Sequence, residues 1–231
     1  MDWFLNNDIL DFGDPVENYF RSKMLPDGFA DSKEVQSNIV EYFAAFDESI
    51  QDFNVEELPQ EDEKYISKDY KIEAMHRMAD SQDMASIPLE LESSGTLKMF
   101  ALYPSLKYVL EHGSTLFIDE LNARLHPLLV RNIILTFISP EINTQNAQLV
   151  FTTHDVWQFS NELLRWDEIW LVNKGENGVS ELYSLADFKD EEGNKVRRDE
   201  ILSRKYLMGV YGAIPVLKPM KMMTRGNVDG K

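Results

Sequence analysis

Hydrophobic and polar residues follow two different patterns along the chain, and the change comes near residue 92. Residues 1–58 have the texture of helices and loops, and the apolar side chains of residues 35–50 recur at the three- and four-residue spacing of an amphipathic helix. Residues 70–76 and 87–92 instead carry the pattern of two strands that flank a polar loop. We therefore expect the front of the chain to form a helical and β-hairpin region.

After residue 92, apolar segments of strand length alternate with segments of helix length. Residues 93–113 begin with cap-type residues and end at a glycine, as a helix does, and Pro104 inside them should kink that helix. Strands are then expected at residues 115–118, 148–153, 168–174 and 179–185, and helices at residues 127–138 and 156–164. This alternation predicts an α/β fold in which helices flank a parallel or mixed sheet.

Charge divides the chain at the same place. The net charge is −17, and residues 1–92 carry 23 acidic and 7 basic residues, against 17 and 16 in the rest of the chain. We expect this acidic front to be a solvated face without direct nucleic-acid binding, because phosphate contacts depend on Lys and Arg. Three parts are predicted: the acidic region at 1–92, an α/β core at 93–217 and a flexible tail at 218–231.

Other features of the composition limit the chemistry and the compartment. The chain has no cysteine, which excludes disulfides, thiolate metal sites and thiol catalysis. No apolar run reaches the roughly 20 residues that span a bilayer. The first residues are acidic, whereas a secretory signal begins with basic residues. A cytoplasmic protein with no membrane segment is the simplest expectation.

Two carboxylates directly follow the first apolar strand. TLFI at residues 115–118 runs into Asp119 and Glu120. In nucleotide hydrolases, an aspartate at a strand end supports Mg²⁺, and a neighbouring carboxylate can polarise the water that attacks the γ-phosphate. The same pair can also cap a structural turn, so this motif alone leaves both interpretations open.

The next apolar strand also ends in polar residues. QLVFTTHD, residues 148–155, carries Thr153, His154 and Asp155 at its end. In an open α/β sheet, ligands bind beyond the carboxyl ends of the strands, so we expect Asp119, Glu120 and His154 to meet at one edge. A histidine there can donate to a phosphate oxygen. The nearby carboxylates favour this role over a structural one.

A third polar motif opens the long helix. Ser93, Ser94 and Gly95 place hydroxyl groups and free backbone N–H groups at the positive end of a helix, which is an anion-binding arrangement. Read by itself, Ser-Ser-Gly-Thr is also a good N-cap, and capping is the favoured interpretation of this segment alone.

The three motifs in this order resemble those of ABC-type ATPases. ESSGTLKM is similar to the signature motif, TLFIDE to the Walker B strand, and TTHD to the switch-histidine loop. DELNARLHP, DEIWLVNK and YLMGVYGAIP narrow the resemblance to the AAA-type, ABC-fold ATPases related to the OLD (overcoming lysogenization defect) and abortive-infection proteins of bacteria. The similarity covers residues 39–217, so it implies an ABC-ATPase-like core.

The resemblance implies a role for each residue of the first two motifs. Asp119 would support Mg²⁺, Glu120 would act as the general base, and His154 would contact the γ-phosphate of ATP. The implied activity is ATP hydrolysis, and relatives of this kind imply a place in bacterial phage defence.

The resemblance also implies a homodimer that sandwiches ATP between two molecules. Ser93, Ser94 and Gly95 would lie at the nucleotide, with Ser94 and Gly95 reaching the γ-phosphate of ATP bound to the opposite subunit. Asn122 would lie in the loop that meets the partner. Relatives usually carry an acid where Asn122 stands, and this departure leaves its detailed role open.

One element of such an ATPase is missing from the sequence. The phosphate loop GxxxxGK[ST] has no match, and the one Gly-Lys pair is Gly230-Lys231. We therefore expect the chain to correspond to the C-terminal portion of an ATPase and to be inactive alone. The expected partners are a P-loop segment or subunit, a second copy, and a nuclease or toxin effector.

A different class of function remains open beside the ATPase. The chain could be a non-catalytic interaction or regulatory module that retains the ATPase fold, which predicts no Mg-ATP binding. A metal-dependent nuclease is less favoured, because the strands carry no further ordered acid cluster and residues 93–231 are nearly neutral.

Overall fold

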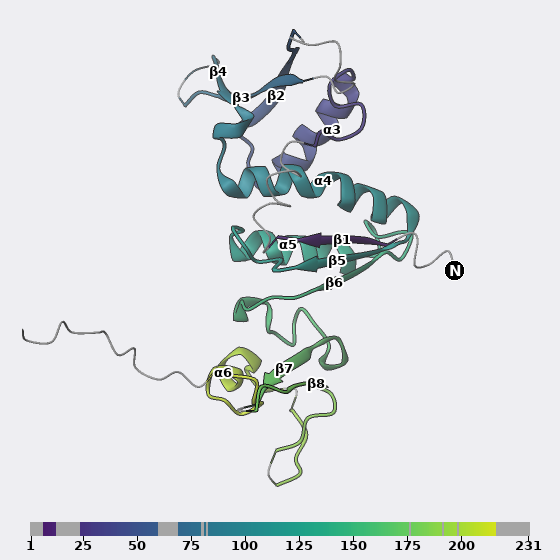
Figure 1. The fold of residues 1–231 in the computed structure, drawn as a ribbon, viewed down its shortest axis with the longest axis vertical. Coiled ribbons are helices and arrows are strands. Elements are labelled where there is room, and N and C mark those ends of the chain that lie inside the picture. Colours follow the sequence, from purple (N-terminus) through teal and green to yellow (C-terminus); the bar gives the residue numbers. More distant parts are fainter. Residues whose placement is uncertain are drawn as a thin grey trace, which may run out of the picture. The chain divides into compact units, whose positions relative to one another are not determined.

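The chain divides into two compact units, residues 1–155 and residues 156–231. The computed structural model describes residues 7–12, 24–59, 69–79, 81, 83–175, 177–190, 192–197 and 199–215 (Figure 1). The tail expected at 218–231 lies outside the described residues, and the domain boundaries expected from the sequence stay predictions.

A three-stranded parallel sheet lies in the first unit, with the strand order β1-β5-β6 (Figure 1). Its strands are β1 (Asp8–Asp11), β5 (Thr115–Asp119) and β6 (Gln148–Phe151). β5 is the central strand, and its Leu116 and Ile118 are buried, as the apolar pattern of a parallel strand requires. The predicted α/β fold class, with a parallel sheet and flanking helices, is confirmed.

Two helices flank this sheet, α4 (Ser94–His112) and α5 (Pro127–Ile138). α4 continues through Pro104 and ends at Gly113, whose φ of +66° suits glycine. A Cβ there would also lie 2.4 Å from the Gln145 carbonyl oxygen, so no larger residue fits without movement. Among the described residues, no helix is both long enough and apolar enough to cross a membrane.

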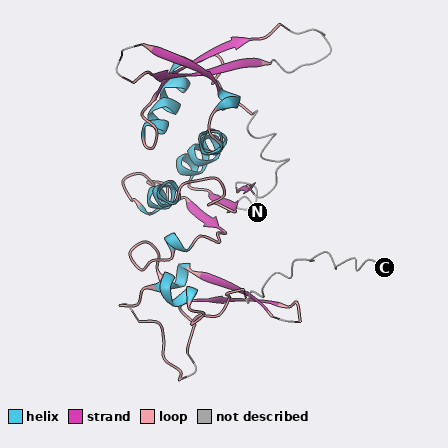
Figure 2. Ribbon diagram, turned by 90° about the vertical axis from the view of Figure 1, so that its left-hand side faces the viewer, coloured by secondary structure: helices cyan, strands magenta, loops and turns pink. Residues whose placement is uncertain are grey.

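An antiparallel sheet with the order β2-β3-β4 forms the other part of the first unit (Figure 2). This part of the unit contains α3 (Lys33–Ala44), the strands β2 (Ile50–Glu57), β3 (Tyr70–Arg77) and β4 (Met84–Pro88), and the 3₁₀ helix η1 (Leu89–Leu91). α3 begins after Ser32, whose hydroxyl caps the Val35 N–H. The predicted amphipathic helix is confirmed for residues 35–44, with its Ile39 and Phe43 buried, but it ends before residue 50, where β2 begins.

Aromatic rings join α3, β2 and α4 into one core. The ring centroid of Phe53 on β2 lies 5.1 Å from that of Phe29 and 6.2 Å from that of Phe43. It also lies 6.1 Å from the ring of Phe100 on α4. All four rings are fully buried, at 0–1% exposure. This cluster holds the start of α4, where the predicted signature motif lies, against the antiparallel sheet.

The first unit also corrects several sequence predictions. Helices and loops were expected over residues 1–58, and this is wrong for β1 and β2. The strand expected at residues 87–92 is largely wrong, because β4 ends at Pro88 and η1 follows. The strand expected at residues 148–153 is two residues shorter and ends at Phe151. Thr152 still donates through its N–H to the Ile118 carbonyl, and the side chains of Thr152 and Thr153 bond to Asp119 and Asn122.

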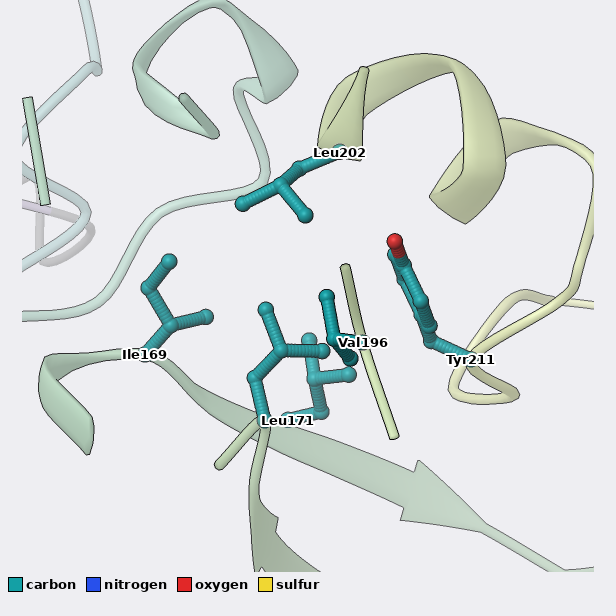
Figure 3. Close-up of a cluster of buried hydrophobic side chains, with 6 residues drawn as sticks. Ile169, Leu171, Val196, Leu202 and Tyr211 are labelled. Carbon is teal, nitrogen blue, oxygen red and sulfur yellow. The ribbon is translucent and has the colours of Figure 1, made fainter. Parts of the chain in front are cut away.

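The second unit is built around a two-stranded antiparallel sheet. Its elements are the 3₁₀ helices η2 (Val156–Gln158) and η3 (Trp166–Glu168), β7 (Trp170–Lys174), β8 (Ser180–Ser184) and α6 (Leu202–Leu207). Figure 3 shows its core, in which Leu171, Leu202 and Tyr211 are labelled among the buried side chains. The expected hairpin is confirmed, whereas the helix expected at 156–164 is reduced to the single 3₁₀ turn η2.

Candidate functional site

The candidate site lies where β5 and β6 end. The parallel register aligns Ile118 with Phe151, so Asp119 and Thr152 leave the two strands side by side. The Thr152 hydroxyl donates to Asp119 Oδ1 and accepts from the Glu120 N–H at 3.0 Å. One threonine therefore ties both carboxylate-bearing residues to the end of the neighbouring strand.

Glu120 has an unusual backbone conformation. Its φ is +54°, in the left-handed region that residues with a Cβ seldom occupy. Such a conformation costs on the order of 1–3 kcal/mol and persists only where the surroundings hold it. Here the Glu120 N–H is bonded to the Thr152 side chain, and the next N–H, of Leu121, donates to the Thr152 carbonyl at 3.1 Å. The turn after β5 is thus fixed from β6.

The Glu120 carboxylate contacts His154. Glu120 Oε2 lies 3.0 Å from His154 Nδ1, and both side chains are open to solvent, at 39% and 74% exposure. A substrate can therefore reach this pair. The expected meeting of Asp119, Glu120 and His154 at one edge of the sheet is what the structure shows.

Asn122 completes the group and orients the histidine. Thr153 Oγ1 lies 2.7 Å from Asn122 Oδ1 and donates to it, while Asn122 Nδ2 lies 3.1 Å from His154 Nε2. The same Asn122 nitrogen lies 3.4 Å from His154 Nδ1, so the amide contacts both ring nitrogens, while Nδ1 also lies against the Glu120 carboxylate. Asn122 therefore holds the imidazole ring beside Glu120.

The Ser93–Gly95 motif takes a different position. Ser93 is the N-cap of α4, and its hydroxyl accepts from the Thr96 N–H at 3.1 Å, so the capping interpretation holds for this residue. Ser94 is exposed at the first turn of the helix. A Cβ on Gly95 would lie 3.3 Å from the Arg124 carbonyl oxygen, so the helix start packs closely against the loop after Glu120.

Lys98 is a residue of this region that the sequence did not reveal. It lies on α4, is 5% exposed, and its ammonium donates to the carbonyl oxygens of Glu120, Leu121 and Ala123 at 3.2, 2.8 and 2.8 Å. Burial lowers the pKa of Lys98 to about 7, although the Glu120 charge raises it. A lysine on a largely apolar helix face gives no sequence signal for such contacts.

The low pKa of Lys98 predicts how the stability of the protein depends on pH. The pKa falls from 10.5 to about 7 on folding, so between these pH values the unfolded chain binds more protons at Lys98 than the folded chain does. The free energy of unfolding should therefore rise with pH over this range. The Lys98→Met variant should lack the part of this pH dependence that comes from Lys98. Urea denaturation at several pH values measures the difference; parallel profiles for the two proteins would show that Lys98 does not titrate there.

Asp119 is the candidate residue of this edge for holding a metal ion. Among the residues that the structure describes, no three His, Asp or Glu side chains cluster as metal ligands. Mg²⁺ often takes only one or two carboxylates and completes its shell with water and substrate phosphates. The exposed Asp119 carboxylate, held by Thr152, meets that requirement.

Comparison with protein families gives a match over the first unit. A family model described as "AAA domain, putative AbiEii toxin, Type IV TA system" matches residues 13–156, more than half of the chain. That segment includes the start of α4, the turn after β5, and His154. None of the curated proteins matches the chain.

Proposed function

Because the chain belongs to this AAA-domain ATPase family, we propose that it binds Mg-ATP at the carboxyl edge of β5 and β6 and hydrolyses ATP once a phosphate loop is supplied. The observation that supports this proposal is the Glu120–His154 pair, at 3.0 Å, beside Asp119. The chain's membership in this family supports nucleotide binding in general terms. The geometry of this edge suggests which residues take part.

Each residue of the edge has a task in the proposed reaction. Asp119 would support a Mg²⁺ ion, which supplies charge neutralisation on the phosphates. Glu120 would accept a proton from the attacking water, and the contact with His154 Nδ1 would keep that carboxylate oriented. A hydrogen bond from His154 to a phosphate oxygen requires a protonated ring nitrogen that is released from Asn122.

The proposed partners follow from what the chain does not provide. The 231 residues contain no GxxxxGK[ST] motif, so the phosphate loop would come from a P-loop segment or subunit. Parallel sheets are normally covered on both faces, yet Val150, which lies opposite Phe117 on one face, is 50% exposed. That face could receive the added segment. A second copy would complete the ATP sandwich through Ser94 and Gly95.

The family description, which names a putative toxin of a type IV toxin–antitoxin system, supports a place in such a system. A role in phage defence, with a nuclease or toxin as effector, is a further part of the proposal. A non-catalytic module with the same fold is the competing function. The absence of a phosphate-loop motif favours it for the isolated chain. The two functions differ in whether Asp119 contributes to nucleotide binding.

Titration calorimetry with Mg-ATP tests the proposal. We expect the chain to bind Mg-ATP weakly and the Asp119→Ala variant to bind at least about 10-fold more weakly, because the substitution removes the metal-supporting carboxylate. Asp69→Ala, which removes an exposed carboxylate elsewhere in the first unit, should bind as the unmodified chain does. No heat from the unmodified chain, or equal binding by Asp119→Ala, would favour the non-catalytic module.

A further inference from the structure

We propose that Lys98 is a positioning residue that holds the main chain of residues 120–123 so that Glu120 is aimed at His154. The inference rests on the proposed function for the part that concerns hydrolysis. The contacts themselves concern only this chain and can be tested without nucleotide. The three hydrogen bonds of Lys98 go to backbone carbonyls, so the positioning role acts through the backbone of the loop.

The Lys98 side chain directs its N–H donors to carbonyl oxygens of the loop. A lysine has three N–H donors, and Lys98 directs them to three carbonyl oxygens within one four-residue stretch, those of Glu120, Leu121 and Ala123. The Phe12 ring lies on another side, with its centroid 4.0 Å from Nζ. Lys98 is therefore not available to bind phosphate and does not replace the lysine of the absent phosphate loop.

The loop needs hydrogen-bond donors at this point. Three carbonyl dipoles that converge on one place repel one another unless a donor lies between them, and a buried carbonyl without a donor is costly. The loop also has two residues with positive φ, Glu120 at +54° and Arg124 at +62°. Lys98 satisfies the carbonyls of a backbone that would otherwise relax out of this strained form.

The position of Lys98 on α4 gives the contact a further consequence. It lies one turn after Ser94 and Gly95, and Gly95 itself approaches the Arg124 carbonyl of the same loop. The residues proposed to meet ATP on the opposite molecule are thus joined, through Lys98 and this loop, to the proposed general base. A shift of the helix start would move the backbone that carries Glu120.

Backbone exchange and the His154 tautomer test this role. We expect Lys98→Met to increase amide hydrogen exchange in residues 120–125 at least about 10-fold, while the other amides of the first unit change less. Nitrogen NMR of His154 should also show a changed tautomer distribution, because Glu120 no longer faces Nδ1. Lys107→Met is the matched control: Lys107 lies on the same helix, is 46% exposed and pairs with Glu111, and its loss should alter neither signal.

Two outcomes would overturn the proposal. One is a folded Lys98→Met protein in which the loop exchange and the His154 tautomer match those of Lys107→Met. If Lys98→Met fails to fold, Lys98→Arg decides, because a planar guanidinium keeps the charge but does not bring three donors to one point. If Lys98→Arg leaves the amide exchange of the loop and the His154 tautomer unchanged, then Lys98 contributes to stability and does not position Glu120. Altered loop signals without any Mg-ATP binding would contradict the proposed function and leave the positioning role intact.

Discussion

Replacing Glu120 with glutamine is expected to reduce ATP hydrolysis at least about 100-fold while Mg-ATP still binds, since general-base catalysis of this kind contributes roughly 10²–10⁴-fold. The substitution keeps the size of the side chain and one acceptor for the His154 N–H. It removes the negative charge that takes a proton from water. The measurement is steady-state phosphate release by the assembly that contains the phosphate-loop partner, with binding followed separately.

The control for this prediction is Glu141→Gln, which neutralises an exposed carboxylate in the same unit. It should turn over ATP at the unmodified rate. Unchanged turnover in Glu120→Gln would remove Glu120 from the chemistry and leave the His154 contact as a structural feature. Loss of both binding and turnover would assign Glu120 to nucleotide or metal binding instead.

Phe53→Ala is expected to destabilise the first unit by about 3–5 kcal/mol, the usual loss when a buried phenylalanine is truncated. Phe53 is 1% exposed and lies at the centre of the ring cluster that joins α3, β2 and α4. Its loss leaves a cavity under α4. The measurement is urea-dependent hydrogen exchange of peptides from α4 and β5, which report on the first unit alone.

Leu58→Ala serves as the comparison, because Leu58 directly follows β2 but is 40% exposed. It should cost less than about 1 kcal/mol, as substitutions at exposed positions usually do. A loss of similar size in Phe53→Ala would show that the ring cluster does not hold α4 in place.

The edge of the parallel sheet could be predicted from sequence for a physical reason. β5 is short, apolar and buried, so its boundaries are visible in the pattern, and the turn that follows must carry Asp119 and Glu120. The expected meeting of these residues with His154 at one edge of the sheet required only that β6 be the parallel neighbour. The assigned roles in ATP hydrolysis stay predictions.

Other parts of the fold could not be predicted, because their residues form no recognisable pattern of hydrophobic and polar positions. β2 has an irregular register between Ile50 and Asp52, and this break disturbs the alternation by which a strand is recognised. β1 has four residues, two of them acidic, and forms only by pairing with β5 far along the chain. The contacts of Lys98 depend on three backbone carbonyls, and backbone acceptors carry no residue-specific signal.

Nucleotide binding at the carboxyl edge of β5 and β6 can be tested directly by locating bound Mn-ATP by NMR. Mn²⁺ accepts the same oxygen ligands as Mg²⁺, and it broadens the signals of nearby nuclei. We expect Mn-ATP to broaden selectively the amides of residues 119–122 and 152–154, and Asp119→Ala to abolish the effect. Broadening that is absent, that centres elsewhere, or that persists unchanged in Asp119→Ala would contradict nucleotide binding at this edge.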